Sequence, residues 1–275
     1  MRKKVTCHCE GAQSATAAIQ KKRLDCFALW ARNDVGGFTL AEVLITLGII
    51  GVVAALTMPS LIQKQNDRAT VAKVKKMYSV ISNAVRLWQA EEGCDTDVAD
   101  CIGQYAAYDC QNAFSGIEKK LNIVDRVYQN QSKNVAWLPA VSYGLDGSAA
   151  AQGWEGVSQL GGSGTCEYLL NDGVTMTVHM PDEGGRVSGF IFFDVNGPKA
   201  PNRVGKDIFP IGIGSYRSPA KGVNPYYTED NSGNNWGLCR YRNGEECSPD
   251  DGKSPTAYVI AHDKLPDLVK MGYPK

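Results

Sequence analysis

The chain has 275 residues, and its 29 basic and 29 acidic side chains give a formal net charge of zero. This length suggests one or two domains. Hydrophobic residues make up 43% of the chain and charged residues 21%, a composition that excludes an intrinsically disordered protein. A net charge of zero also argues against a dedicated nucleic-acid-binding protein, which normally shows a basic excess.

The first 37 residues differ from the rest of the chain in charge. Residues 1–37 carry a net charge of +4, and the remaining residues carry −4. Residues 38–58 follow directly and are almost wholly apolar, with Glu42 as their one charged side chain. At ~1.5 Å per residue, a helix of this length can span a bilayer. The positive-inside rule therefore predicts that residues 1–37 stay cytoplasmic while the chain after residue 58 enters or crosses the membrane.

The junction between these two segments carries a specific motif. It reads Gly36-Gly37-Phe38-Thr39-Leu40-Ala41-Glu42, and an apolar run follows. This motif resembles the N-terminal signature of type IV prepilins and type II secretion pseudopilins. The resemblance implies that a prepilin peptidase cuts between Gly37 and Phe38 and that the new amino group of Phe38 is methylated. Residues 1–37 are then a leader that is removed, although leaders in that family are usually shorter.

Glu42 is the charged residue of the apolar segment. A carboxylate inside a membrane helix costs roughly 2.5–3.5 kcal/mol on insertion scales, so it needs a solvated position or a partner. In the first case Glu42 stays solvated at the interface. In the second it accepts the charged amine of Phe38, from its own chain or from a neighbouring subunit, and the family resemblance favours this assembly role. Assembly of such subunits head to tail generates an open filament.

The helix is expected to continue beyond the membrane. Pro59 marks the end of the apolar helix or a kink in it. Residues 59–92 then form an amphipathic continuation that ends before Gly93. Apolar residues recur there at spacings of three and four, which predicts one buried helical stripe: Val71, Val74, Tyr78, Ile81, Val85 and Trp88. A coiled-coil seam is the alternative, but packing under a sheet is favoured because strand-like segments follow.

The remaining residues, 93–275, are expected to form a globular α+β head. Asn171-Asp172-Gly173 is a hairpin turn signal between two strand-like runs. The expected strands are 165–170, 174–180, 187–195 and 208–213. The glycine-rich residues 144–164 predict a surface loop, and residues 262–275 predict a short terminal helix or an extended tail. A long N-terminal helix packed on an antiparallel sheet is an α+β fold, and the pilin resemblance implies the same architecture.

Six cysteines remain once the leader is removed: Cys94, Cys101, Cys110, Cys166, Cys239 and Cys247. An even number of cysteines in an exported domain indicates disulfides. Cys239–Cys247 closes a small loop and is the favoured pair. A second pair is expected among the first three cysteines, with the third of them joined to Cys166. Zinc is the poorer interpretation, because there is no C-x-x-C and the chain after the leader has only His179 and His262.

The segment 193–207 is the most distinctive part of the head. It offers oxygen donors that suit calcium in a tight loop: Asp194, Asn196, Asn202 and Asp207. The segment is not an EF-hand loop, because it lacks the glutamate at the twelfth position. The alternative is a turn in which Asn and Gly take left-handed conformations and Asp side chains cap backbone amides. No cofactor is required by either interpretation, and structural calcium is the one ligand that the sequence suggests.

The resemblance implies a structural subunit of a type II secretion pseudopilus or a type IV pilus, not an enzyme. Its expected partners are copies of itself or other pilins, a prepilin peptidase, the inner-membrane assembly platform, and membrane lipid before assembly. Nucleic acid is not an expected partner. The expected location is the bacterial inner membrane, crossed once with the head in the periplasm, and then a filament in the periplasm or at the cell surface.

Two other functions can be compared with this one. A minor pilin could carry an adhesive or DNA-binding head, for which Lys199, Arg203 and Lys206 form a local basic cluster, although the net charge of −4 opposes DNA binding. A membrane-anchored hydrolase is disfavoured, because the chain lacks a G-x-S-x-G motif and has few histidines. The choices between pilus and pseudopilus, and between major and minor subunit, stay open.

Overall fold

A computed structural model gives the fold. It describes residues 37–94, 98–102, 109–128, 135–139, 141–145, 147, 149–151, 165–180, 189–214, 222–225 and 254–274. The chain divides into two compact units, Met1–Leu61 and Ile62–Lys275. The long helix α2 (Leu40–Glu92) begins in the first unit and ends in the second. The expected helix therefore forms, and it begins two residues after Phe38.

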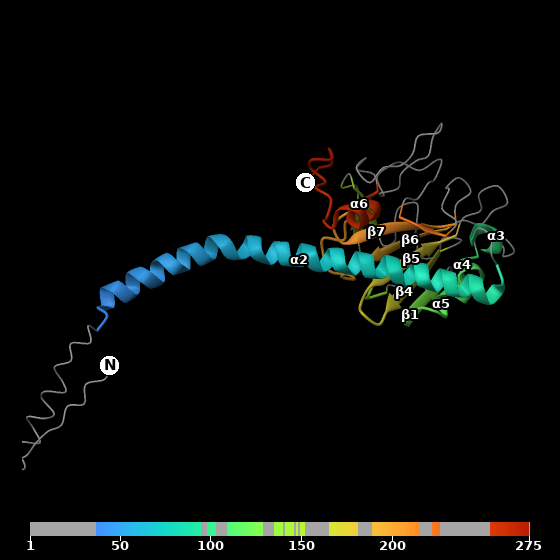
Figure 1. Cartoon of the computed structure of the whole chain (residues 1–275), viewed down its shortest axis with the longest axis horizontal. Coiled ribbons are helices and arrows are strands. Elements are labelled where there is room, and N and C mark those ends of the chain that lie inside the picture. Colours follow the sequence, from blue (N-terminus) through green and yellow to red (C-terminus); the bar gives the residue numbers. More distant parts are fainter. Residues whose placement is uncertain are drawn as a thin grey trace, which may run out of the picture. The chain divides into compact units, whose positions relative to one another are not determined.

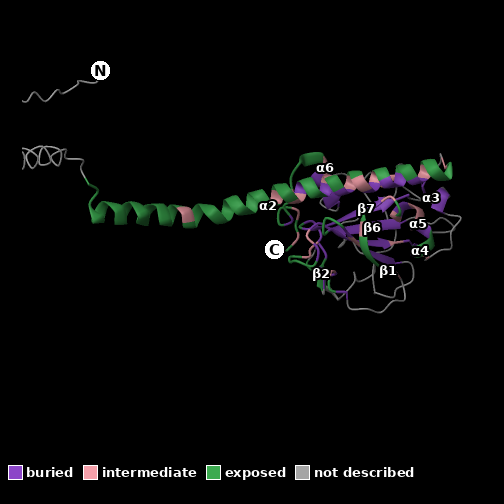
Figure 2. Cartoon of the chain, turned by 90° about the horizontal axis from the view of Figure 1, so that it is seen from below, coloured by how far each residue is buried: buried purple, intermediate pink, exposed green. Residues whose placement is uncertain are grey.

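The described part of the first unit is the apolar beginning of α2. Its residues are exposed almost throughout, including the large apolar ones, and Figure 2 colours this part of the helix green. Among the described residues, α2 is the one helix that is long and apolar enough to cross a membrane, with a mean hydropathy of 2.3 over its most apolar 18 residues. Pro59 lies inside α2, two residues before the boundary between the units. Its predicted kink stays a prediction.

The second unit is built on a six-stranded sheet in which all neighbouring strands are antiparallel. Its strands, in spatial order, are β1 (Ile123–Tyr128), β4 (Thr165–Leu170), β5 (Thr175–His179), β6 (Gly189–Asp194), β7 (Ile208–Ile213) and β8 (Val223–Asn224). A separate hairpin joins β2 (Val141–Tyr143) to β3 (Ala149–Ala151). The antiparallel sheet and the long helix together give the expected α+β, pilin-like arrangement.

The second half of α2 lies across one face of this sheet (Figure 1). Its buried residues follow the predicted stripe and add two members: Val71, Val74, Met77, Ile81, Ala84, Val85 and Trp88. They share one core with the alternate residues of β4 to β7 that face the helix, such as Tyr168, Val178 and Phe193. The stripe therefore packs on the protein's own sheet, as predicted, because this face of the sheet is equally apolar.

Three lysines near the middle of α2 attach it to different parts of the second unit. Lys73 Nζ donates a hydrogen bond to the carbonyl of Val195 at 2.8 Å. Lys76 pairs with Asp172 in the β4–β5 turn at 2.7 Å. Lys75 pairs with Asp263 at the end of α6 (Pro255–His262). The ion pairs of Lys75 and Lys76 are partly exposed. We therefore expect them to fix the register of the helix and to add little to the stability of the protein.

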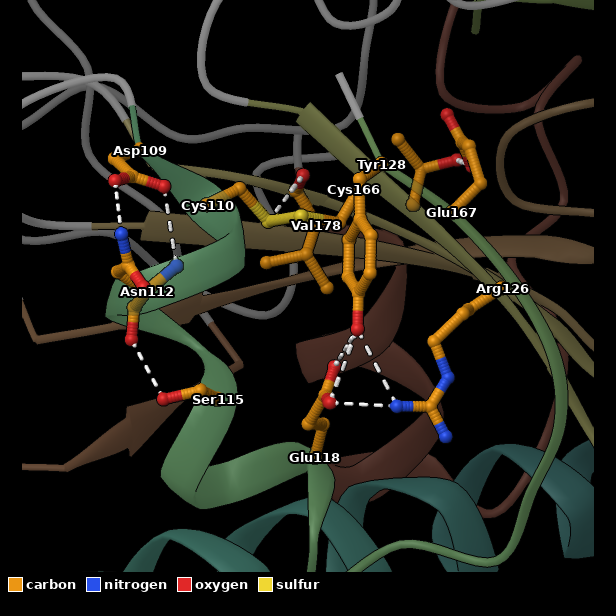
Figure 3. Close-up of a disulfide and its surroundings, with 11 residues drawn as sticks. Asp109, Cys110, Asn112, Ser115, Glu118, Arg126, Tyr128, Cys166, Glu167 and Val178 are labelled. Atoms are coloured by element: carbon orange, nitrogen blue, oxygen red, sulfur yellow. Dashed lines mark hydrogen bonds and ion pairs between the residues drawn. A yellow bond between two sulfur atoms is a disulfide. The ribbon is translucent and has the colours of Figure 1, made fainter. Parts of the chain in front are cut away.

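Short helices connect α2 to the sheet: α3 (Val98–Ile102), α4 (Cys110–Ala113) and α5 (Ser115–Glu118). One disulfide, Cys94–Cys101, joins the end of α2 to α3, and a second, Cys110–Cys166, joins α4 to β4. Figure 3 shows the second disulfide and, beside it, the contact between α5 and β1. There, Glu118 accepts hydrogen bonds from Arg126 at 2.7 Å and from the Tyr128 hydroxyl at 3.2 Å.

The other face of the sheet is also covered. Phe190 and Phe192 on β6 and Ile208 on β7 pack against Leu145, Val204 and the C-terminal Leu268. Every residue of β6 and β7 is therefore buried. Both strands are apolar at nearly every position because neither of their faces meets water.

Three parts of the sequence-based prediction need correction. The terminal helix is α6, at Pro255–His262. It therefore ends at residue 262, where the sequence predicted that a short helix or an extended tail would begin. The chain after it is not helical and turns back so that Leu268 joins the core. The predicted loop 144–164 contains β3, and its sequence of three alanines shows no alternation of apolar and polar residues. Strand β1 was missed because its exposed edge position allows Asp125 and Arg126.

The half-buried His179 predicts a dependence of stability on pH. Its ring lies 4.8 Å from that of Phe190, measured between centroids, and burial lowers its pKa to about 4 from the ordinary 6.5. The unfolded chain therefore binds an extra proton between these values, so stability present above pH 6.5 is lost as the pH falls towards 4. We expect His179→Gln to remove this contribution, up to about 3 kcal/mol. Chemical denaturation of both proteins from pH 7 to 4 measures it; parallel curves would contradict it.

Candidate processing and assembly site

The residues around the predicted cleavage point have a defined geometry. Gly37, Phe38 and Thr39 are not helical, and the first residue of α2 is Leu40. The predicted scissile bond, Gly37–Phe38, therefore lies in non-helical chain just before a helix. Phe38 is 86% exposed, so none of the residues that the structure describes covers it.

Glu42 folds back onto the start of its own helix. Its Oε2 accepts a hydrogen bond from the Thr39 backbone N–H at 2.8 Å and another from the Thr39 hydroxyl at 2.9 Å. In return, the Thr39 hydroxyl oxygen accepts the Glu42 backbone N–H at 3.2 Å. This reciprocal arrangement is a capping box, in which Thr39 is the N-cap and Glu42 the third helical residue. It satisfies backbone donors that the first helical turn leaves without partners.

Sequence analysis singled out Glu42 but missed Thr39. The signal was present, since Thr39-Leu40-Ala41-Glu42 fits the T-x-x-E pattern that starts many helices. The site thus consists of a scissile bond in non-helical chain, a threonine that starts the helix, and a glutamate bound to that threonine.

The comparisons with known proteins agree with this geometry. Residues 32–58 match the family model described as the prokaryotic N-terminal methylation motif, which is the prepilin-type signature. No curated protein and no solved structure matches the chain. The N-terminal segment is thus of the type found in precursors of type IV pilins and pseudopilins. The signature implies processing by a prepilin peptidase, membrane anchoring and assembly into pilin filaments, and it is typical of structural proteins rather than enzymes.

The four candidate calcium ligands lie where β6 ends, with Asp194 as its last residue, and in the loop that leads from there to β7. Asp207 accepts the backbone N–H groups of Asn202 at 2.8 Å and Arg203 at 2.7 Å, and also the Asn196 side-chain amide at 3.2 Å. Asp194 accepts the Asn196 N–H at 3.0 Å. These are the amide-capping contacts of the turn interpretation, and Asn202 and Gly197 do take positive φ angles, 47° and 67°.

The same loop buries two carboxyl groups close together. Burial, with a contribution from the charge of Asp207, raises the pKa of Asp194 to about 8. Burial also raises the pKa of Asp207. Asn196 Oδ1 is buried without a hydrogen-bond partner in the described part of the chain. Two buried acids beside an unsatisfied oxygen favour a bound proton or cation over two free charges.

The basic cluster proposed for nucleic acid is largely used within the fold. Arg203 Nη2 donates hydrogen bonds to the carbonyls of Leu145 at 2.7 Å and Pro274 at 2.6 Å. It thereby holds the C-terminal segment against the β2–β3 side of the second unit. Lys199 and Lys206 are exposed beside it. With the guanidinium engaged by carbonyls, only these two lysines are left to contact a phosphate.

The other chemical candidates are placed as follows. Within the described ranges, no cluster of three or more His, Cys, Asp or Glu is placed to hold a metal ion. His179 is half-buried beside Phe190, and His262 lies at the end of α6 with its ring 4.5 Å from that of Tyr258, measured between centroids. Cys239 and Cys247 lie outside the described residues, as does the leader before Gly37. Their predicted disulfide and its loop therefore stay predictions.

Proposed function

We propose that this protein is a structural subunit of a type II secretion pseudopilus or type IV pilus, without catalytic activity. The observation that supports this most is the prepilin-type signature at the start of an exposed, apolar helix. Such a helix is compatible with lipid before assembly, and neighbouring copies bury it afterwards. Residues 1–37 are the leader, 38–58 the filament-core helix, 59–92 its amphipathic continuation and 93–275 a head in the periplasm.

The first test is the N-terminus of the protein purified from membranes of its native cells. Intact mass and N-terminal sequencing should find a chain that starts at N-methyl-Phe38. A chain that retains residues 1–37, or one cut beyond Met58, would contradict the proposal. The protein would then be an ordinary anchored or secreted domain.

The second test concerns assembly. Glu42→Gln removes the charge that is proposed to accept the amine of Phe38 and changes the shape of the side chain little. We expect it to reduce incorporation into sheared filaments at least tenfold while the protein accumulates in the membrane. Glu92→Gln is the matched control, since Glu92 is exposed at the other end of the same helix and should assemble normally. Equal incorporation of the two variants would contradict the assembly role.

We also propose a structural calcium ion in the β6–β7 loop. The proposal rests on the unsatisfied Asn196 Oδ1 beside the buried Asp194 and Asp207. Calcium at a hundred times its dissociation constant would add about 2.7 kcal/mol to stability. EDTA should therefore lower the melting temperature of the protein in detergent, and added calcium should restore it, whereas Asp207→Asn should abolish the response. An unchanged melting temperature would leave the amide-capped turn as the explanation of this segment.

A further inference from the structure

The start of α2 shows two independent features at the proposed cleavage site. The first backbone hydrogen bond of the helix runs from the Val43 N–H to the Thr39 carbonyl at 3.2 Å. The capping box between Thr39 and Glu42 closes around the same residue. Thr39 is therefore the residue at which non-helical chain becomes helix, and Phe38, the second residue of the Gly37–Phe38 bond, directly precedes it.

We propose that Thr39 is a positioning residue for the removal of the leader: its hydroxyl, held by Glu42, starts the helix at Leu40 and keeps the Gly37–Phe38 bond in non-helical chain. This inference rests on the proposed processing of the protein and names the residue that sets its geometry. Thr39 contacts neither reacting atom. It acts through the conformation of the two residues before it.

The chemistry of the cut explains why this conformation matters. Hydrolysis breaks the C–N bond between Gly37 and Phe38, and water supplies the hydroxyl of the new carboxyl group and a proton of the new amine. If the helix began earlier, the Gly37 carbonyl would accept the Ala41 N–H, four residues later, and the scissile bond would lie inside a helical turn. If the first turn frayed, the distance between the bond and the membrane helix would vary. An N-cap at Thr39 prevents both, because it satisfies the first-turn donors in one register only.

The capping box also separates two properties of Glu42 that the family signature combines. One is the hydrogen-bonding shape that holds Thr39, which a glutamine reproduces, since capping boxes use Glu or Gln. The other is the negative charge, which a glutamine lacks. Removal of the leader should therefore depend on the first property and assembly on the second.

The experiment measures cleavage of full-length precursor in detergent by a purified prepilin peptidase, as kcat/KM with the product identified by mass. Thr39→Val keeps the size and branching of the side chain and removes the hydroxyl, so only a fraction of the precursor holds the competent conformation. We expect kcat/KM to fall about fivefold. Thr39→Ser and Glu42→Gln keep the box, and both should be cleaved within about twofold of the native rate.

Each result decides between the explanations. Native cleavage of Thr39→Val would overturn the inference, and so would a slow Glu42→Gln precursor or failure of Thr39→Ser to restore the rate. Failure of the native precursor to be cut after Gly37 would instead overturn the proposed processing itself. The melting temperature of the second unit should be unchanged in every variant, which separates a local effect on the helix start from misfolding.

Discussion

Replacing Cys110 and Cys166 together by alanine is expected to lower the free energy of unfolding by about 4 kcal/mol. The two cysteines are 56 residues apart in sequence and join α4 to β4, where both are fully buried. In the chain-entropy account, a disulfide stabilises by restricting the unfolded chain, and the gain grows with the loop that it closes. The loss would be a large part of the stability of a typical domain, about 5–15 kcal/mol.

The second disulfide supplies a matched control. Cys94 and Cys101 are only seven residues apart, so their replacement by alanine should cost about 2.5 kcal/mol. Thermal and chemical unfolding of the full chain in detergent, under non-reducing conditions, would measure both. A larger loss for the shorter loop would contradict the entropic explanation and would place the effect in local packing around α3.

Gly116→Ala is expected to destabilise the second unit by about 1–3 kcal/mol or more, because the core has no room for the added methyl group. A Cβ atom at this position would lie 2.2 Å from Trp88 Cδ1 and from Trp88 Nε1. Trp88 is 1% exposed and is held in the core between α2 and the sheet, so its indole ring cannot move away freely. Either α5 must shift away from α2 or the ring must leave its position.

Two further variants would show whether this contact is the cause. Gly222→Ala is the control, since nothing lies within 4 Å of the position of its added Cβ, and it should change stability little. In a Trp88→Phe background, the ring is smaller and Gly116→Ala should cost clearly less, so the two substitutions should not be additive. Equal costs in both backgrounds would show that the methyl group disturbs something other than the indole ring.

Several elements could be predicted because their signals are local. A bilayer-length apolar run is readable from composition alone, and the recurrence of apolar residues from Val71 to Trp88 indicates a helix face at any position in a fold. The hairpin around Asn171-Asp172-Gly173 was equally local, since Gly173 takes a φ of 81° in the β4–β5 turn. Strand β7, at Ile208–Ile213, has the predicted bounds because it is apolar and bounded by turn residues.

What was missed depends on partners that are distant in sequence. Strand β1 is exposed at half of its residues, and it exists because β4 supplies its hydrogen bonds. Helix α6 ends where the chain turns at Asp263, which has a left-handed φ of 55°. No sequence pattern predicted this turn. Arg203 looked like part of a basic patch, but two carbonyls far along the chain engage its guanidinium group.

The sequence by itself determined the N-terminal segment: a cleavable leader signature, a helix long enough for a bilayer and a carboxylate at its start, all written in contiguous residues. Only the tertiary structure decided which residues face α2, why residue 116 must be glycine, and that Asp194 and Asp207 are buried together in one loop. The physical reason is range. Helix, turn and membrane signals depend on near neighbours in the chain, whereas burial, close packing and the pKa of a carboxyl group depend on atoms that folding brings together.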